Sequence, residues 1–215
     1  MIFTETKLKG AFVIDVEKRE DHRGFFGRVW CAREFAAHGL NPTIAQINTS
    51  HSRKKGTIRG LHYQVAPYAE AKFIRCTRGR IYDAIIDLRP DSPTYLQWIG
   101  QELSAENHRM LYVPENFAHG FVSLEDDCEV YYPATQFYTP EAERGIRWND
   151  PTFNITWPVP IEVFTEKDMS HPDFVPVAGP KPAADRAALP PERRTPPSRP
   201  SSRSPFSRQG SKSPV

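Results

Sequence analysis

Residues 72–88 read KFIRCTRGRIYDAIIDL, and this stretch decides the fold class of the 215-residue chain. It holds two short runs, Lys72–Thr77 and Arg80–Leu88, that are rich in isoleucine, phenylalanine and tyrosine. Such residues fit a pleated, half-buried surface and are typical of β-strands. Only two residues separate the runs, which leaves no room for a helix between them. The stretch therefore predicts two consecutive strands.

Runs of the same kind recur at close spacing through residues 1 to about 175. They are Ala11–Val16, Thr43–Thr49, Leu96–Leu103, Met110–Val113, His119–Leu124 and Cys128–Phe137. Turn signals such as Arg89–Pro93 and Glu125–Asp127 separate them. One short helix is predicted at Ala32–His38, with Gly39 as its C-terminal stop. Strands at this spacing without helices between them predict an all-β antiparallel sandwich or barrel.

Proline content and charge both change near residue 175. Ten of the 21 prolines lie from Pro176 onward, mixed with serine and arginine. From Val175 onward eight basic residues stand against two acidic ones, so this segment carries a charge of +6 and the rest of the chain −4. Such a composition buries too little apolar surface to offset the entropy lost on ordering. We therefore expect one domain over residues 1–175 and a disordered basic tail over 176–215.

Composition and charge exclude several classes of function. The pI of about 8.4 reflects the tail, whereas the rest of the chain is mildly acidic and unlike a nucleic-acid-binding domain. The three cysteines have no CxxC spacing, which indicates buried thiols in a reducing compartment. No secretory leader pattern opens the chain and no run of about 18 apolar residues occurs, so the sequence predicts a cytoplasmic protein. The tail has two alternative interpretations. It could bind anionic surfaces or be phosphorylated at Ser204 and Ser213, or it could be a solubilising extension.

The segment Thr57–Gln64 combines a strand pattern with side chains that can do chemistry. Plain alternation would place Arg59 and His62 on opposite faces of the strand. Gly60, between them, is typical of a β-bulge, which would turn both side chains toward one pocket. Taken alone, a histidine in a strand also suits a structural, hydrogen-bonded role, so both interpretations of His62 stay open at this point.

Three further residues are candidates for chemistry, each with a structural alternative. His119 lies among aromatic residues beside Gly120, which lets a backbone or a ligand approach closely. Lys72 lies within an apolar run; pointing inward it would need a partner or an anionic ligand, whereas on an edge strand it would face solvent. Asp168 could reach back to orient a histidine, or lie in a surface turn.

A series of short motifs runs through residues 1–175 in a characteristic order and spacing. They are Asp21–Phe26, Gln46–Ser50, Arg59–Gln64, Ala71–Lys72, Asp87–Arg89, Ser92–Thr94, Pro114–Gly120, Glu143–Trp148, Trp157–Pro158 and Lys167–Asp168. Together these motifs resemble the dTDP-4-dehydrorhamnose 3,5-epimerase family. The resemblance ends where the proline-rich tail begins.

The resemblance implies a cupin-type jelly roll that needs no metal or other cofactor and forms a homodimer. It implies a nucleotide-linked 4-keto-6-deoxyhexose as substrate, with dTDP-4-dehydro-6-deoxy-D-glucose inverted at C3 and C5 to dTDP-4-dehydro-L-rhamnose. Carried over by motif, His62 is the base, Asp168 holds it, Tyr132 is the acid on the opposite face, and Lys72 lies by the C4 oxygen. The implied substrate-binding residues are Arg23, Phe26, Gln46, Asn48, Arg59, His119, Glu143 and Lys167.

These residue types suit the chemistry that the resemblance implies. A hydrogen beside a ketone becomes removable when the enolate is stabilised as it forms, and the ammonium of Lys72 can supply that stabilisation. Inversion requires the new proton to arrive from the other face of the sugar, which a tyrosine opposite a histidine can provide. The planar fork of an arginine matches the oxygens of a diphosphate.

Three positions depart from the usual family pattern. Arg28 stands where the family commonly has glutamate, and Glu70 replaces a usual glutamine just before Lys72. Pro133 follows the two tyrosines where a lysine is usual, and a proline there indicates an edge strand or a bulge. The adjacent tyrosines leave the acid open between Tyr131 and Tyr132, of which we favour Tyr132. An epimerase that acts at only one centre, or on another nucleotide sugar, is therefore the alternative function.

Two other classes of protein are less compatible with these residues. A metal-dependent cupin needs two histidines two positions apart and a downstream acid, but His62-Tyr63-Gln64 offers one histidine. A sugar-binding protein without catalysis would not need a histidine, a carboxylate, a lysine and a tyrosine together.

Overall fold

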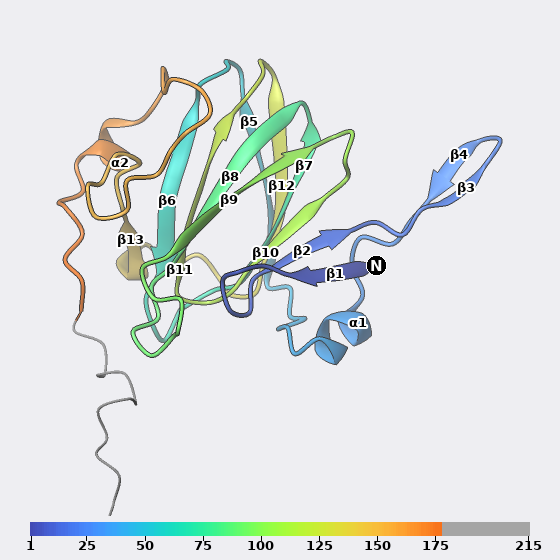
Figure 1. The fold of residues 1–215 in the computed structure, drawn as a ribbon, viewed down its shortest axis with the longest axis horizontal. Coiled ribbons are helices and arrows are strands. Elements are labelled where there is room, and N and C mark those ends of the chain that lie inside the picture. The colour runs from blue at the N-terminus through green and yellow to red at the C-terminus, as the bar shows by residue number, and fades with distance from the viewer. Residues whose placement is uncertain (178–215) are drawn as a thin grey trace, which may run out of the picture. The chain divides into compact units, whose positions relative to one another are not determined.

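The computed structural model describes residues 1–177, and in them two antiparallel β-sheets face each other (Figure 1). The six-stranded sheet has the order β1 (Ile2–Glu5), β2 (Phe12–Asp15), β10 (Met110–Val113), β7 (Lys72–Arg78), β12 (Cys128–Ala134) and β5 (Gln46–Ser52). The five-stranded sheet has the order β13 (Glu143–Gly145), β6 (Ile58–Gln64), β11 (Phe117–Ser123), β8 (Arg80–Asp87) and β9 (Trp98–Ser104). All neighbouring strands are antiparallel, so the predicted all-β sandwich is confirmed.

The strands predicted from the sequence are present, with ends shifted by a few residues. The predicted helix is α1 (Ala32–Ala37), and the chain turns out of it at Gly39, whose φ is +72°. The elements that were not predicted are β1, β13, β3 (Arg19–Asp21), β4 (Gly24–Phe26), the 3₁₀ turn η1 (Pro140–Ala142) and α2 (Glu166–Met169). Each has only three or four residues, too few for an apolar period to show.

Pro133 lies inside a central strand, so of its two predicted positions the edge strand is wrong. β12 pairs along its whole length with β5, where Pro133 stands opposite Ile47. With β7 it pairs up to Tyr131 and again at Ala134, and the ladder has no pair at Pro133 itself. The register is the same on both sides of this gap, and the irregularity of the ladder lies between Glu129 and Val130, so the predicted bulge is not at Pro133 either. A proline has no N–H to donate, which fits the missing pair at this position.

Side chains from both sheets form the apolar interior of the sandwich. The buried cluster includes Ile74, Leu111 and Val130 from the six-stranded sheet and Ile85 and Phe121 from the five-stranded sheet. Burying a side chain of this size contributes about 1.5–3 kcal/mol. Toward β5, β6 and β13 polar side chains replace the apolar ones, and the interior opens into a cavity.

A β-bulge at Gly60 decides which side chains of β6 face the interior. His62 pairs with His119 of β11 and Arg59 pairs with Phe121, so β6 holds one more residue than β11 between these pairs. Gly60 has a φ of +99°, and a Cβ there would lie 2.6 Å from the carbonyl oxygen of His119. Only glycine fits this approach. The predicted bulge is confirmed, and it brings Arg59 and His62 to the same face of the strand.

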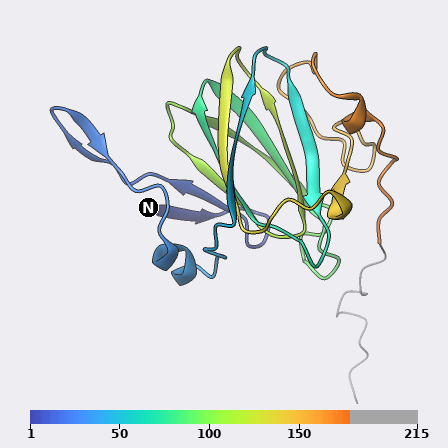
Figure 2. The same cartoon turned by 180° about the vertical axis from the view of Figure 1, so that it is seen from behind.

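The segment after β13 packs on the outer face of the five-stranded sheet and carries α2 to the side of β6 (Figures 1 and 2). Ile146 and Phe153 are buried there against Leu61 and Ala118, and Phe174 packs against the same cluster. This apolar packing of the segment after β13 allows Asp168 of α2 to contact β6, although the two are more than 100 positions apart in the sequence.

The chain keeps its contacts with this domain up to the last described residue. The backbone N–H of Val177 donates to the Tyr95 hydroxyl at 2.9 Å, and the N–H of Phe174 donates to Asp150 Oδ2 at 2.7 Å. The predicted tail lies outside the described residues, apart from Pro176 and Val177. Among the helices of residues 1–177, none is long and apolar enough to cross a membrane.

Strands β3 and β4 form a two-stranded arm that extends away from the sandwich (Figures 1 and 2). All residues of both strands are exposed. Arg23, in the turn, forms an ion pair with Asp21 at 2.6 Å, and its side chain is 78% exposed. Phe26 is 71% exposed. A protruding hairpin that exposes an aromatic side chain is typical of a contact with another molecule.

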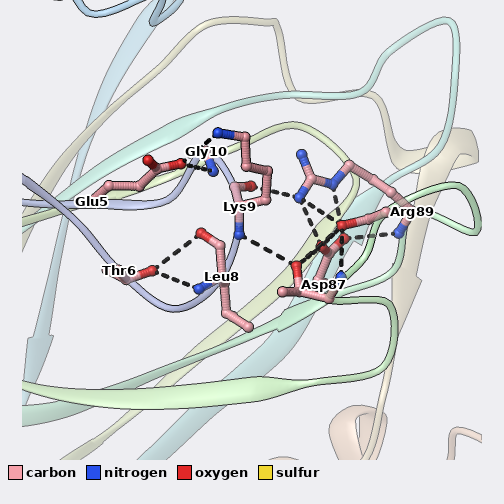
Figure 3. Close-up of polar contacts among 9 residues, drawn as sticks. Glu5, Thr6, Leu8, Lys9, Gly10, Asp87 and Arg89 are labelled. Atoms are coloured by element: carbon pink, nitrogen blue, oxygen red, sulfur yellow. Dashed lines mark hydrogen bonds and ion pairs between the residues drawn. The ribbon is translucent and has the colours of Figure 1, made fainter.

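A buried carboxylate ties the end of β8 to the turn between β1 and β2 (Figure 3). Asp87 is fully buried and accepts hydrogen bonds from Arg89 Nε at 2.8 Å and from Thr94 Oγ1 at 2.7 Å. Arg89 also donates to the carbonyl oxygen of Lys9 at 2.6 Å. Burial alone would raise the pKa of Asp87, but these hydrogen bonds outweigh it and lower that pKa. The charged network therefore links the end of β8, in the five-stranded sheet, to a turn of the six-stranded sheet.

Candidate active site

Strands of both sheets line one cavity of about 280 Å³. The six-stranded sheet contributes Gln46, Asn48, Lys72, Tyr132 and Ala134, the five-stranded sheet contributes His62, Tyr63, Gln64 and Glu143, and Glu70 and Tyr138 come from loops. Most of these side chains are polar or charged, so the cavity suits a polar ligand. Six residues predicted for the site therefore meet in it, from segments far apart in the chain.

His62 is held by a carboxylate at the edge of this cavity. Its Nε2 donates a hydrogen bond to Oδ1 of Asp168 at 2.6 Å. Asp168 is buried on α2, where the Thr165 hydroxyl caps the helix by accepting from the Asp168 N–H at 3.2 Å. Burial alone would raise the pKa of Asp168. The hydrogen bond from His62 and the positive charge of that histidine outweigh the effect of burial, so the pKa of Asp168 is lowered. A charged carboxylate at Nε2 leaves Nδ1 as the basic nitrogen of the neutral ring.

Lys72 points into the cavity and not into solvent. Strand β7 lies between β10 and β12, so the edge-strand alternative is wrong. The side chain is 12% exposed, and Nζ forms an ion pair with Glu70 Oε1 at 3.0 Å. Nζ also lies 3.5 Å from the carbonyl oxygen of His62. An ammonium group thus lies at the cavity wall, close to the histidine.

The two adjacent tyrosines of β12 face opposite sides of the sheet. Tyr132 lines the cavity and packs against the interior cluster. Tyr131 is 41% exposed and lies in an apolar groove with Trp30 and Ile47 on the outer face. Burial raises the pKa of Tyr132, so its hydroxyl carries a proton at neutral pH. His62 and Tyr132 therefore reach the cavity from different sheets.

Four polar residues predicted to bind substrate lie at or beside the cavity. Gln46 and Asn48 alternate along β5 on the cavity side. Glu143 accepts a hydrogen bond from the Tyr138 hydroxyl at 2.9 Å and forms an ion pair with Lys167. Burial alone would raise the pKa of Glu143. The hydrogen bonds from Lys167 and Tyr138 outweigh the effect of burial and lower the pKa of Glu143. Glu143 is therefore charged at the rim.

Two predicted site residues lie next to the cavity without lining it. Arg59 donates to the Ser52 hydroxyl at 3.2 Å and to the carbonyl oxygen of His51 at 2.8 Å. His119 is 7% exposed, and its Nε2 lies 2.9 Å from Oδ2 of the fully buried Asp83. Burial raises the pKa of Asp83. His119 thus forms a buried pair in the strand next to His62.

Arg23 and Phe26 are not brought to the cavity of their own chain. Both lie on the arm formed by β3 and β4, which extends on the side of the sandwich away from β6 and β13 (Figure 1). Arg28, one of the departures from the family pattern, lies near the base of the arm and forms an ion pair with Glu34 at 2.7 Å. A substrate in the cavity of the same copy cannot reach the arm in this arrangement.

Sequence reasoning gave no role in the site to five residues of the cavity wall, which are Tyr63, Gln64, Glu70, Ala134 and Tyr138. Tyr63 and Gln64 were quoted only as part of a motif, although Gln64 follows His62 by two positions and so shares its face. Tyr138 lies in the loop after β12, where no periodic pattern indicates its direction. Among residues 1–177, no group of three or more His, Cys, Asp or Glu side chains is arranged to hold a metal ion.

The chain is similar to known proteins over most of its length. A family model described as dTDP-4-dehydrorhamnose 3,5-epimerase matches residues 5–175. The epimerase of that name from Shigella flexneri is 41% identical over 172 residues, which cover 80% of this chain and 94% of that protein. The crystal structure of the Bacillus anthracis epimerase, with TDP and PPi bound, is 40% identical with a TM-score of 0.77. The match covers 80% of this chain and 99% of that one.

A third similar protein has a narrower activity. ChmJ of Streptomyces bikiniensis, a 3′-monoepimerase solved with dTDP-quinovose, is 31% identical with a TM-score of 0.71, covering 78% of this chain and 85% of that one. A double variant of ChmJ, with a histidine changed to asparagine and a tyrosine to phenylalanine, was solved with dTDP. Its two altered residues are the same number of positions apart as His62 and Tyr132.

Proposed function

This chain belongs to the dTDP-4-dehydrorhamnose 3,5-epimerase family, and we propose how the residues of its cavity carry out the reaction. It is an isomerase of dTDP-rhamnose biosynthesis that acts on dTDP-4-dehydro-6-deoxy-D-glucose. The observation that carries the proposal is that His62 and Tyr132 reach one cavity from opposite sheets, with Lys72 beside them.

His62 acts as the base. The carbons C3 and C5 of the sugar flank the C4 ketone, which makes their hydrogens acidic. Nδ1 of the neutral ring takes the proton, and Asp168 stabilises the imidazolium that results. The electron pair of the broken C–H bond passes to the C4 oxygen and forms an enolate.

Lys72 stabilises the enolate as it forms. Its ammonium is fixed at the cavity wall and little exposed, so it does not have to reorganise while negative charge develops on the C4 oxygen. Tyr132 then delivers its hydroxyl proton to the opposite face of the same carbon, which inverts the centre. Solvent returns the proton to Tyr132, and His62 releases its own, so the enzyme ends in its starting state.

The remaining polar residues bind the rest of the substrate. Gln46, Asn48 and Glu143 line the cavity and offer hydrogen bonds to sugar hydroxyls and to the nucleotide. Arg59 and Lys167 lie beside it and supply positive charge for the diphosphate. Binding energy from this remote dianion helps to orient the sugar for proton transfer.

Proton NMR in deuterated water tests this function directly. The protein is incubated with a panel of 4-keto-6-deoxy nucleotide sugars, including dTDP-4-dehydro-6-deoxy-D-glucose. We expect deuterium at both C3 and C5 of this sugar and formation of dTDP-4-dehydro-L-rhamnose. The proposal is overturned if neither position exchanges in any sugar of the panel.

A second candidate is epimerisation at a single centre. The similarity to the 3′-monoepimerase ChmJ favours keeping this alternative, since the same fold supports the narrower reaction in that protein. The same NMR spectra separate the two, because a mono-epimerase gives inversion at one carbon only.

The reaction is expected to need no metal ion, because Lys72 supplies the positive charge that a Lewis acid would otherwise provide. Overnight treatment of the protein with a strong chelator, followed by an assay in chelator, should leave turnover unchanged. An untreated sample carried through the same incubation is the control. Loss of turnover that a divalent ion restores would contradict the mechanism.

The protein is proposed to act as a homodimer in which the arm of one copy completes the cavity of the other. Arg23 and Phe26 are exposed on the arm and far from their own cavity, although both are expected to bind substrate. A two-fold arrangement lets each copy give its arm and receive one. The expected mass in solution is twice the chain mass of 24.6 kDa.

Mixing two impaired variants shows whether the arm acts in the partner's cavity. Arg23→Ala and His62→Asn copies are unfolded, mixed in equal amounts and refolded together. In a hybrid dimer one cavity has both an intact His62 and an intact arm, so about one quarter of wild-type activity should return, given random pairing in a two-fold dimer. Each variant refolded alone is the control. No recovery in the mixture would mean that the arm does not act in trans.

A further inference from the structure

Glu70 lies on the cavity wall and has no part in the mechanism described above. We infer that Glu70 is a positioning residue, which clamps the Lys72 ammonium against the wall and offsets its charge where Tyr132 must remain a protonated hydroxyl. The inference deepens the proposed function of this cavity and rests on it.

Both carboxylate oxygens of Glu70 are occupied by donors from different strands. Oε1 lies 3.0 Å from Lys72 Nζ, and Oε2 accepts a hydrogen bond from Gln64 Nε2 at 3.0 Å. The side chains of Glu70 and Lys72 are only 10% and 12% exposed. An ion pair so shielded from water is screened much less than one on the surface, which makes it an effective clamp.

Gln64 is itself fixed, so Glu70 has a rigid support. The Gln64 Oε1 accepts from the backbone N–H of Thr139 at 2.6 Å, which sets the orientation of the amide. Its Nε2 therefore faces acceptors, and besides Glu70 these are the carbonyl oxygens of Tyr68 and Phe137 at 3.0 and 3.2 Å. The amide cannot turn over without losing these contacts.

In this chain the geometry suits a carboxylate at position 70 better than an amide. Lys72 and Gln64 both present donors to the side chain, and a carboxylate can accept from both at once. A glutamine has one acceptor oxygen, so its NH₂ group would face either the ammonium or the Gln64 amide. Glu70→Gln would therefore release Lys72 or Gln64 from the clamp, as well as remove a negative charge.

The charge of Glu70 also acts on the proton donor. Burial raises the pKa of Tyr132, the negative charge of Glu70 raises it further, and the positive charge of Arg59 lowers it. The other titratable groups that line the same cavity are His62, Tyr63, Lys72, Tyr138 and Glu143. Without Glu70, an unpaired Lys72 ammonium and Arg59 would face Tyr132 together and would favour the tyrosinate, which has no proton to deliver.

Titration of Tyr132 by NMR tests the inference without relying on turnover. Protein labelled with ¹³Cζ-tyrosine is titrated through the alkaline range, and the Tyr132 signal is identified as the one absent from Tyr132→Phe. In Glu70→Gln we expect the Tyr132 midpoint to fall by roughly one pH unit, the size of effect of a unit charge a few ångström away in partly buried surroundings. Glu70→Asp keeps the charge and should leave the midpoint within a few tenths of the wild-type value.

A matched variant separates this local effect from a general change of charge. Glu102→Gln removes the same charge from an exposed ion pair with Arg80, outside the cavity, and should not move the Tyr132 midpoint.

The pH dependence of kcat is then compared across the variants. In Glu70→Gln the alkaline limb should shift to lower pH together with the Tyr132 midpoint, with KM changed by less than about threefold.

The outcomes distinguish the inference from the proposed function. An unchanged or raised Tyr132 midpoint in Glu70→Gln, whose far-UV circular dichroism matches the wild type, overturns the inference. If the midpoint is lowered in Glu70→Gln but the wild-type protein shows no epimerisation, the electrostatic role of Glu70 is supported and the proposed function is overturned. A lowered midpoint with an unshifted alkaline limb shows that Tyr132 is not the group whose ionisation limits turnover, and the positioning role fails.

Discussion

Replacement of His62 by asparagine is expected to abolish both the uptake of solvent deuterium and epimerisation. Asparagine can still donate to Asp168 and keep its place in β6, but it cannot accept the proton from the carbon beside the ketone. A positioned base contributes roughly 10²- to 10⁴-fold to such a step, so turnover should fall by at least that range. Proton NMR in deuterated water measures exchange and inversion in one experiment.

A second histidine provides the control for this substitution. His51 lies on β5, is 41% exposed and pairs with the exposed Asp127, so His51→Asn changes the same side chain outside the cavity. It should exchange and epimerise at the wild-type rate. If His62→Asn still incorporates deuterium at that rate while folding normally, another group is the base.

Replacement of Tyr132 by phenylalanine is expected to separate exchange from inversion. The base, the Lys72 ammonium and the ring at position 132 all remain, so the enolate still forms. The proton can then return only from the side it left, because the donor on the opposite wall is gone. Deuterium should still enter at a reduced rate, while the inverted product falls on the order of 10²-fold or more.

Tyr131→Phe is the matched control, since it removes the same hydroxyl from the neighbouring side chain on the outer face. It should leave inversion intact. Loss of inversion in Tyr131→Phe with normal inversion in Tyr132→Phe would move the acid by one position. If both variants invert fully, water or another side chain delivers the proton and the two-residue scheme is wrong.

The central strands of the fold could be predicted because each carries enough apolar and β-branched residues to show a pattern. Strand β8, for example, runs Arg80–Asp87, and its predicted range differs from this by one residue. The arm could not be predicted, since β3 and β4 have three residues each and every one of them is exposed, which leaves no buried face to produce an alternation. Short strands made by pairing alone leave little trace in a sequence.

The candidate site was predictable residue by residue only through the family motifs. Alternation cannot decide whether Lys72 points into the cavity, because that depends on which strands flank β7. Nor can spacing show that Asp168 meets His62, because the contact depends on the apolar packing of the segment after β13. The ion pair of Glu70 with Lys72 needed the structure as well, since the sequence does not show whether two charged residues two positions apart contact each other.

The bulge at Gly60 limits how this enzyme can change during evolution. It shifts the in-and-out alternation of β6 by one residue, so that His62 and Gln64, two positions apart, share the cavity face only while the extra residue is present. A point mutation alters one side chain and leaves that phase intact. A deletion or insertion of a single codon between Ile58 and His62 would instead turn the base toward the outer face of the sheet and replace it with a neighbour. The lineage can therefore tune its substrate by substitution, whereas a frame-preserving indel in this strand turns His62 and Gln64 out of the cavity together.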